Sequence, residues 1–224
     1  MNPEQARFNM REQARFNMIE QQVRTWEVLD QTVLDLLQQV PREDFVPAQY
    51  AGLAFADLEI PLGHGESMLS PKMEARVVQS LALKKTDTVL EIGTGSGYLT
   101  ALLAKLAKHV YSVERIPELT ADAAARLRSH GISNVTLEAG DGAQGWDAGT
   151  YDVIVLGGSV PLLAPALQQS LNIGGRLFAV IGEAPAMEAT LITRVGADAF
   201  RTDILFETCI PALINAPQPE RFTF

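Results

Sequence analysis

The sequence is poor in the residues that form disulfides, metal centres and nucleic-acid contacts. Its 224 residues include one cysteine, Cys209, and three histidines. One thiol cannot form an internal disulfide, and these few Cys and His residues show no ligand spacing, so we expect no metal site. Lys and Arg number 18 against 27 Asp and Glu, a formal net charge of -9. This balance disfavours sequence-independent binding of nucleic acid, which requires clustered cations.

Long apolar runs are also missing. No stretch approaches the roughly 20 apolar residues that span a bilayer, and the start of the chain lacks the basic-then-apolar pattern of a secretory signal. Together with the lone cysteine, this predicts a cytoplasmic protein without a membrane partner. The 47% hydrophobic content is nevertheless sufficient for one substantial core.

The most informative stretch is Val89–Tyr98, where an apolar run ends in three glycines at alternate positions. An Ala- and Leu-rich segment follows at helical spacing, which predicts a strand, a tight loop and a helix. Glycines let a ligand approach the backbone, and the N–H groups at the start of the helix face that ligand. Three glycines alone are compatible with nicotinamide, flavin and adenosylmethionine cofactors. The even spacing of Gly93, Gly95 and Gly97 differs from the dinucleotide fingerprint, which has two residues between its second and third glycines.

Beyond this loop, strand and helix patterns alternate, which indicates a doubly wound α/β fold with a mostly parallel, seven-stranded sheet. The expected strands are Thr88–Ile92, His109–Glu114, Asn134–Ala139, Tyr151–Leu156, Gly175–Ile181, Ala189–Val195 and Asp203–Ala212. The expected helices are Lys72–Leu83, Tyr98–Ala107, Ile116–His130 and Pro161–Leu171.

Acidic residues follow the second and third of these strands. Glu114 comes 21 positions after Gly93, where a carboxylate can accept hydrogen bonds from both hydroxyls of a ribose. The alternative is an ordinary solvated carboxylate. Asp141-Gly142 follows the third strand, where it can meet an adenine edge, although Asp-Gly is also a favourable turn.

The N-terminal part begins with a repeat, because Glu4–Met10 recurs letter for letter at Glu12–Met18. We expect the first copy to be a frayed extension. The apolar spacing over Asn17–Gln39 predicts two amphipathic helices with a break near Trp26–Asp30. The polar, glycine-bearing stretch Gly63–Pro71 is a candidate lid or substrate loop, with a plain connector as the alternative.

Together these residues resemble the protein-L-isoaspartate O-methyltransferase family of class I adenosylmethionine-dependent methyltransferases. The motifs that carry the resemblance lie in the family's order between Met18 and Leu213: Val40–Pro47, Pro61–Gly65, Val89–Tyr98, Val110–Arg115, Gly140–Gly142, Gly145-Trp146 and Gly174–Leu177. The resemblance implies a Rossmann-like fold and methyl transfer from S-adenosyl-L-methionine to the carboxylate of L-isoaspartyl residues in damaged proteins. S-adenosyl-L-homocysteine is then the product, and protein repair is the outcome.

The resemblance also implies which residues hold the cofactor. They are Ser67, Met68, Glu91, Gly93, Thr94, Gly95, Ser96, Gly97, Glu114, Arg115, Asp141 and Gly142. A carboxylate acceptor is already ionised at neutral pH, so the reaction needs no strong general base. The enzyme then has to align the reacting atoms, which explains why the sequence contains no catalytic triad.

One departure from the family bears on activity. The family's loop reads Gln-Thr-Ile-Ser-x-Pro-x-Met, whereas this chain reads Glu66 to Met73 as Glu-Ser-Met-Leu-Ser-Pro-Lys-Met. The active-site serine of the family falls on Leu69, so Ser67 and Ser70 are the candidate catalytic residues. Loss of one hydrogen-bond donor typically lowers the rate by about 10²-fold to 10³-fold. A methyltransferase with another acceptor and a cofactor-binding protein with impaired catalysis therefore remain alternatives.

We expect three parts: a helical N-terminal extension with the substrate loop over 1–80, the cofactor domain over 81–214, and a tail over 215–224. A monomer or a weak homodimer is the expected assembly. Cys209 is expected in the core of an apolar strand, and Trp146 near the adenosine.

Overall fold

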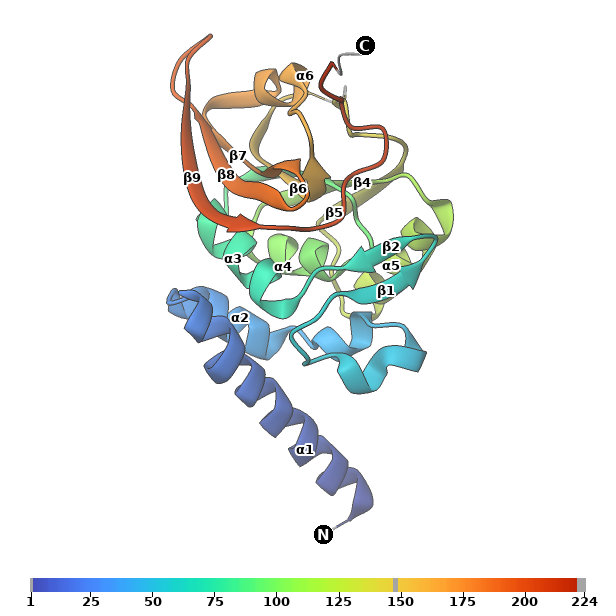
Figure 1. The fold of residues 1–224 in the computed structure, drawn as a ribbon. Helices are drawn as coiled ribbons and strands as arrows, with labels where there is room; N and C mark the ends of the chain where they lie inside the picture. The colour runs from blue at the N-terminus through green and yellow to red at the C-terminus, as the bar shows by residue number, and fades with distance from the viewer. Residues whose placement is uncertain (1, 147–148, 221–224) are drawn as a thin grey trace. The chain divides into compact units, whose positions relative to one another are not determined.

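The computed structural model describes residues 2–146 and 149–220. The chain forms two compact units, Met1–Gln79 and Ser80–Phe224, which are described one at a time (Figure 1). The division of the sequence into three parts stays a prediction.

The second unit is built on one seven-stranded sheet with the order β5-β4-β3-β6-β7-β8-β9. The first five strands in this order are parallel, and β8 and β9 are antiparallel additions. The strands are β3 Thr88–Ile92, β4 His109–Glu114, β5 Val135–Ala139, β6 Tyr151–Val160, β7 Leu171–Glu183, β8 Ala186–Arg194 and β9 Phe200–Thr208. The helices are α4 Tyr98–Leu106, α5 Pro117–Ser129 and α6 Pro165–Gln169. The predicted fold class is confirmed.

The centre of this sheet is mostly apolar, because parallel strands covered on both faces have no solvent side; the buried Glu91 of β3 and Ser112 of β4 are exceptions. Leu90, Val113, Ile154 and Leu177, which come from four neighbouring strands, are at most 1% exposed. The strand order reverses at β3, whose neighbours are β4 and β6. In open α/β sheets such a switch point forms the crevice where ligands bind.

The first unit is mainly helical, as predicted for the N-terminal extension. It contains α1 Pro3–Met18, a π-helical turn Ile19–Val23, a 3-10 turn Arg24–Trp26, α2 Gln31–Gln39, and 3-10 helices Arg42–Phe45 and Ala48–Leu53. A hairpin of β1 Ile60–Gly63 and β2 Glu66–Met68 follows. The next helix, α3 Pro71–Leu81, ends two residues into the second unit.

The first repeat copy is helical, so the prediction of a frayed extension was wrong. Asn2 caps α1 by accepting the Glu4 N–H at 3.1 Å, and Pro3 occupies the first turn, where its missing N–H costs nothing. Gln5 also donates to Asn9 one turn later at 3.1 Å. These local bonds support the helix even though its first turns are exposed.

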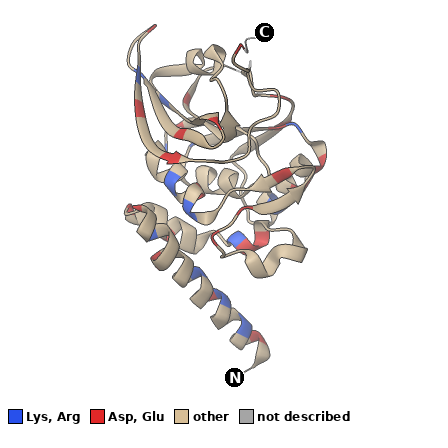
Figure 2. Ribbon diagram, in the orientation of Figure 1, with Lys and Arg blue, Asp and Glu red and all other residues tan. Residues whose placement is uncertain are grey.

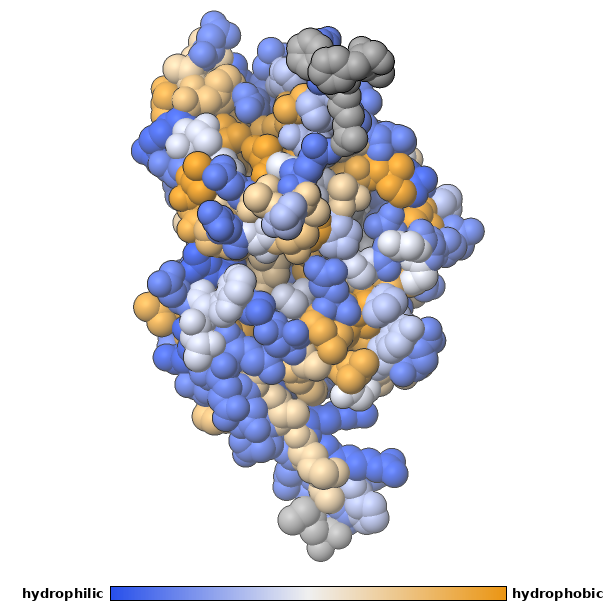
Figure 3. All heavy atoms as spheres, in the orientation of Figure 1, coloured by the Kyte–Doolittle hydropathy of each residue, from blue (hydrophilic) through white to orange (hydrophobic). Residues whose placement is uncertain are grey.

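The surface of α1 combines cations with apolar side chains. Arg7, Arg11 and Arg15 recur at every fourth position; Arg7 and Arg11 are exposed, whereas Arg15 is buried. Figure 2 shows cationic residues in blue along this helix. Phe8 and Met10 are more than half exposed, and hydrophobic residues lie among hydrophilic ones along the helix (Figure 3). Among the described residues, none of the helices combines the length and the apolar character that crossing a membrane requires.

Two predictions near the C-terminal end of the sheet were wrong. The helix expected over Pro161–Leu171 is only the short α6, because β6 continues to Val160 and β7 begins at Leu171. Cys209 is exposed rather than buried, because the edge strand β9 ends one residue before it. The chain beyond Cys209 leaves β9 and hydrogen-bonds to Ser159 at the end of β6 instead.

Candidate functional site

The glycine loop lies at the end of β3, at the switch point of the sheet. Gly93, Gly95 and Gly97 have φ angles of 95°, 52° and 83°, values that side chains with a Cβ rarely adopt. The Gly97 N–H donates to the Thr94 carbonyl at 2.9 Å, which closes the loop, and Gly97 then caps α4. The alternating glycines are therefore required by the backbone of this turn.

Glu114, at the end of β4, is held against this loop. One carboxylate oxygen accepts the Gly95 N–H at 2.9 Å, and the other accepts the Ile116 N–H at 2.9 Å. The residue is only 6% exposed, so the alternative of a solvated carboxylate is wrong. Each carboxylate oxygen has two lone pairs, so acceptor capacity remains for hydroxyl donors.

Glu91 lies in β3 beneath the loop and is fully buried. Its Oε2 accepts the hydroxyls of Thr100 at 2.5 Å and Ser112 at 2.6 Å. Burial raises the pKa of Glu91 to about 7, and the nearby negative charge of Glu114 adds to this effect. The second oxygen, Oε1, accepts no hydrogen bond from any residue that the structure describes.

Sequence reasoning missed the two hydroxyl partners of Glu91. Ser112 lies in the apolar strand β4 and Thr100 in the apolar helix α4, and both are 0% exposed. Thr94 of the glycine loop joins them through a 2.6 Å contact between its hydroxyl and that of Ser112. A hydroxyl residue inside an otherwise apolar strand or helix was the signal that could have identified them.

The remaining predicted residues of the glycine loop lie around it. Thr94 and Ser96 are buried, and the Ser96 hydroxyl accepts the Tyr98 N–H at 3.2 Å, in the first turn of α4. The Ser96 carbonyl accepts a bond from Arg126 of α5 at 3.2 Å. Arg115, which directly follows β4, has an exposed side chain.

Asp141 follows β5 and is exposed. Its Oδ1 accepts the Ala143 N–H at 3.0 Å, a local turn, and its Oδ2 accepts the side-chain amide of Asn215 at 2.6 Å. Gln144 donates to the Asn215 carbonyl at 3.1 Å. No sequence signal pointed to Asn215, which is 74 positions away from Asp141.

The glycines that flank Asp141 are close to bulky neighbours. A Cβ on Gly142 would lie 2.5 Å from Ile92 at the end of β3, so the turn after β5 approaches the glycine loop. A Cβ on Gly140 would lie 2.5 Å from the Trp146 ring. Trp146 thus packs on Gly140, and its indole N–H donates to Glu138 at 3.2 Å. Its predicted place near an adenosine stays a prediction.

The candidate substrate loop belongs to the first unit. Its turn has three consecutive residues with positive φ, namely Gly63, His64 and Gly65. The Ser67 hydroxyl donates to Glu59 at 3.4 Å, and burial raises the pKa of the Glu59 carboxyl while this bond opposes the rise.

The residues after Ser67 differ in exposure. Met68 and Leu69 are 3% and 8% exposed, so neither side chain is solvated. Ser70 is half-buried, and its carbonyl accepts the N–H groups of Met73 and Glu74, which begins α3. Of the two candidate serines, Ser67 lies beside a carboxyl and Ser70 lies at a helix start.

A buried ion pair fixes the backbone of this loop. Arg42 donates to the Leu69 carbonyl at 2.7 Å and to the Ala54 carbonyl at 2.9 Å, and it pairs with Glu74 of α3. Both charged side chains are at most 2% exposed. Arg42 therefore anchors the backbone of Leu69, the residue that stands where the family has its serine, and sequence reasoning did not assign this role to Arg42.

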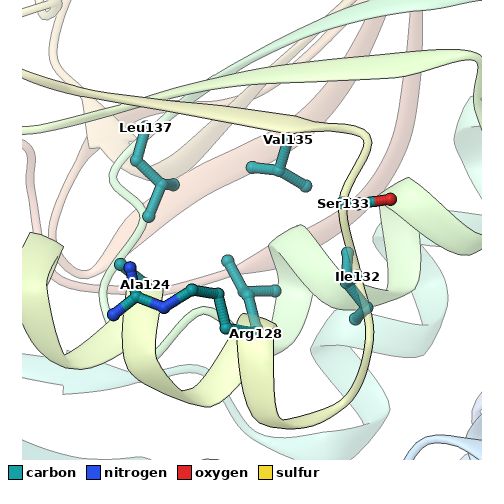
Figure 4. A pocket seen from close by; sticks show the side chains of 7 residues that line it. Ala124, Arg128, Ile132, Ser133, Val135 and Leu137 are labelled. Atoms are coloured by element: carbon teal, nitrogen blue, oxygen red, sulfur yellow. The ribbon is translucent and has the colours of Figure 1, made fainter.

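A separate cavity of about 300 Å³ lies between α5 and β5 (Figure 4). Val135 and Leu137 of β5 line it, whereas Asp141 follows the end of that strand. None of the predicted site residues lines this cavity. Its lining consists of Ala124, Leu127, Arg128, Ile132, Ser133, Val135 and Leu137. Within residues 2–146 and 149–220, no group of three His, Cys, Asp or Glu side chains could hold a metal ion.

The family model described as protein-L-isoaspartate(D-aspartate) O-methyltransferase matches residues 13–211. The chain is 39% identical over 208 residues to protein-L-isoaspartate O-methyltransferase 1 of Rhodopseudomonas palustris, covering 89% of this chain and 85% of the relative. It is also 39% identical over 188 residues to the protein-L-isoaspartate O-methyltransferase of Protochlamydia amoebophila, covering 82% and 89%.

Solved structures share the fold. The beta-aspartate methyltransferase of Plasmodium falciparum, determined in complex with S-adenosyl-L-homocysteine, matches with a TM-score of 0.74 and 22% identity, over 90% of this chain and 97% of that one. At this identity the likeness concerns the fold alone. The family model and the bacterial relatives decide the assignment: the chain belongs to the protein-L-isoaspartate(D-aspartate) O-methyltransferase family.

Proposed function

We propose that this protein transfers a methyl group from S-adenosyl-L-methionine to the free carboxylate of L-isoaspartyl residues in damaged proteins, as an enzyme of protein repair. Family membership supports the reaction. The main observation in favour of cofactor binding is the position of the Glu114 carboxylate. It accepts the Gly95 N–H beside a loop of three glycines with positive φ.

The residues of the second unit suit this cofactor. Glu114 has acceptor capacity left for the two ribose hydroxyls, and Asp141 with Gly142 is proposed for the adenine edge. Glu91 is fully buried and contributes a polar group under the loop, with an Oε1 that accepts no hydrogen bond within residues 2–146 and 149–220. We propose the other cofactor contacts at Gly93, Thr94, Gly95, Ser96, Gly97, Arg115, Ser67 and Met68.

The chemistry requires alignment more than acid-base catalysis. The sulfonium of the cofactor supplies an activated methyl group, and the acceptor carboxylate is already ionised at neutral pH. Orienting two reactants can contribute roughly 7 to 11 kcal/mol to lowering a barrier. We propose that Ser67 and Ser70 provide the hydroxyl donors for the acceptor, with the backbone at Leu69 anchored by Arg42.

Leu69 supports a second candidate function. Its side chain has no donor and is 8% exposed, so it cannot hydrogen-bond a carboxylate as a serine would. A methyltransferase with another acceptor, or a cofactor-binding protein with impaired catalysis, is therefore the alternative.

The test is transfer of a labelled methyl group from S-adenosyl-L-methionine to an isoaspartyl peptide, with the aspartyl isomer as control. Calorimetric titration with S-adenosyl-L-homocysteine precedes it. Turnover of the isoaspartyl peptide alone supports repair. Cofactor binding without transfer favours the alternative, and absence of binding contradicts both.

The cellular setting is also a proposal. We propose a cytoplasmic location, because the single cysteine, Cys209, is exposed and unpaired, which suits a reducing compartment. We propose a monomer or a weak homodimer, which sedimentation at several protein concentrations would test. The division at 1–80, 81–214 and 215–224 is proposed on the same footing.

A further inference from the structure

The chain after β9 is attached to the end of β6 through one residue, Ser159, which is 0% exposed. The Ser159 N–H donates to the Pro211 carbonyl at 2.8 Å, and its hydroxyl donates to the Ile210 carbonyl at 3.0 Å. Its own carbonyl accepts the Leu213 N–H at 2.8 Å. We call residues 210–216 the C-terminal strap, and Figure 1 shows this part of the chain returning from β9.

The C-terminal strap borders the glycine loop. A Cβ placed on Gly93 would lie 3.6 Å from the Leu213 side chain, and one on Gly158 would lie 3.0 Å from it. Ala216, at the end of the strap, is 4% exposed and belongs to the sheet's core cluster. The strap is therefore packed at both ends, and Asn215 lies between two anchored residues.

Asn215 connects the strap to Asp141. Its φ of 65° lies in the left-handed region, which Asn adopts more readily than most residues. Its amide donates to Asp141 Oδ2 at 2.6 Å, and Gln144 holds the Asn215 carbonyl at 3.1 Å. Because Ala143 bonds the other oxygen, both Asp141 oxygens have a fixed direction, and each keeps a free lone pair.

We propose that Asn215 is a positioning residue that orients the Asp141 carboxylate toward the exocyclic amino group of the adenine, so that recognition of the base depends on the docked C-terminal strap. This inference rests on the proposed function, in which Asp141 meets the adenine edge. An exposed carboxylate without a second partner rotates freely, and ordering it reduces the gain from each hydrogen bond. A fixed acceptor also disfavours a base that presents an oxygen at the same place, because two acceptors then face each other.

The test compares two ligands and three variants by calorimetry. The ligands are S-adenosyl-L-homocysteine and S-inosyl-L-homocysteine, in which oxygen replaces the 6-amino group. Asn215→Gly removes the amide and keeps the left-handed backbone without strain. Asn215→Asp keeps the shape and places a second carboxylate against Asp141. Gln218→Ala is the control, because Gln218 is an exposed residue of the same tail whose amide donates to the Ala216 carbonyl at 3.2 Å rather than to Asp141.

The wild-type protein is expected to prefer the adenosyl ligand by about tenfold or more, in line with one well-placed hydrogen bond. Asn215→Gly is expected to weaken adenosyl binding about fivefold to tenfold and leave inosyl binding within about twofold, so the preference collapses. Asn215→Asp weakens adenosyl binding further, and Gln218→Ala changes neither ligand.

Three results would overturn the inference. Equal weakening of both ligands by Asn215→Gly means that Asn215 only packs the strap. Unchanged binding of both ligands means that Asp141 needs no positioning. If the wild-type protein does not bind S-adenosyl-L-homocysteine, the proposed function fails and this inference with it. Thermal unfolding of each variant confirms that the sheet remains folded.

Discussion

The candidate substrate loop and the glycine loop each have a buried carboxylate behind them, but the surroundings of the two carboxylates differ. Glu74, behind the candidate substrate loop, pairs with Arg42, which also holds the Leu69 carbonyl. The carboxylate of Glu91, behind the glycine loop, accepts hydrogen bonds from the hydroxyls of Thr100 and Ser112. The ion pair holds the backbone of one loop, whereas burial raises the pKa of the Glu91 carboxyl behind the other loop to about 7, although its two hydroxyl partners oppose the rise.

The largest expected effect comes from breaking the ion pair. Arg42→Met leaves Glu74 buried without its cation, which typically costs about 3 to 5 kcal/mol of unfolding free energy. Urea denaturation measures it. The double variant Arg42→Met/Glu74→Leu is expected to recover most of the loss, since both charges are gone.

Arg201→Met is the control for this experiment, because Arg201 pairs with Asp203 on the exposed edge strand β9. Its cost is expected to stay within about 0.5 kcal/mol. If Arg42→Met lowered the unfolding free energy no more than Arg201→Met does, the buried pair would not anchor the loop.

The raised pKa of Glu91 predicts the second effect, a pH dependence of the unfolding free energy. Its folded pKa of about 7 lies above the ordinary glutamate pKa of 4.5, so the folded state holds the proton more tightly than the unfolded state. The resulting stability is fully present below pH 4.5 and is lost as pH rises through 7. By linkage, the change amounts to about 3 kcal/mol.

Glu91→Gln is therefore expected to flatten the change in unfolding free energy between about pH 4.5 and 7, the range between the two pKa values of Glu91. The exposed Glu188→Gln serves as the matched control and should keep the wild-type slope. An unaltered slope in Glu91→Gln would mean that another group titrates in this range.

The third expected effect concerns Leu69 of the substrate loop and changes methyl transfer without changing cofactor binding. If the lost hydroxyl limits catalysis, Leu69→Ser raises methyl transfer to an isoaspartyl peptide by about 10²-fold, the usual value of one transition-state donor. Affinity for S-adenosyl-L-homocysteine should stay the same. Ser70→Ala, assayed in parallel, loses activity only if Ser70 already replaces the family's serine.

The smallest effect is expected at the far end of the first unit. Phe8 and Met10 are 58% and 64% exposed, so little apolar area is buried there. Deletion of residues 4–11, which removes the first repeat copy and leaves the second copy, Glu12–Met18, in place, should change the unfolding free energy by less than about 1 kcal/mol. Urea denaturation of the shortened chain measures this, and a loss above about 2 kcal/mol would reveal packing that exposure does not show.

Much of the second unit could be predicted from local patterns. The strands β3, β4 and β5 were located to within one residue, because buried parallel strands read as short apolar runs between glycine and polar residues. For β6 the pattern predicted too short a strand, because the strand continues past Leu156 through Gly157 and Gly158 to Val160. Sequence patterns place element boundaries poorly where a strand contains glycine.

The glycine loop, the acidic residues at the strand ends and the family's loop motif are properties of the sequence itself, because positive φ angles and strand periodicity depend on neighbouring residues. Which groups meet each other was decided by the tertiary structure. Asn215 reaches Asp141, Arg42 reaches the Leu69 carbonyl, and Ser112 reaches Glu91 only after the strands and helices have packed. Such contacts join residues 21 to 74 positions apart, and no local pattern specifies which polar group will be buried beside which.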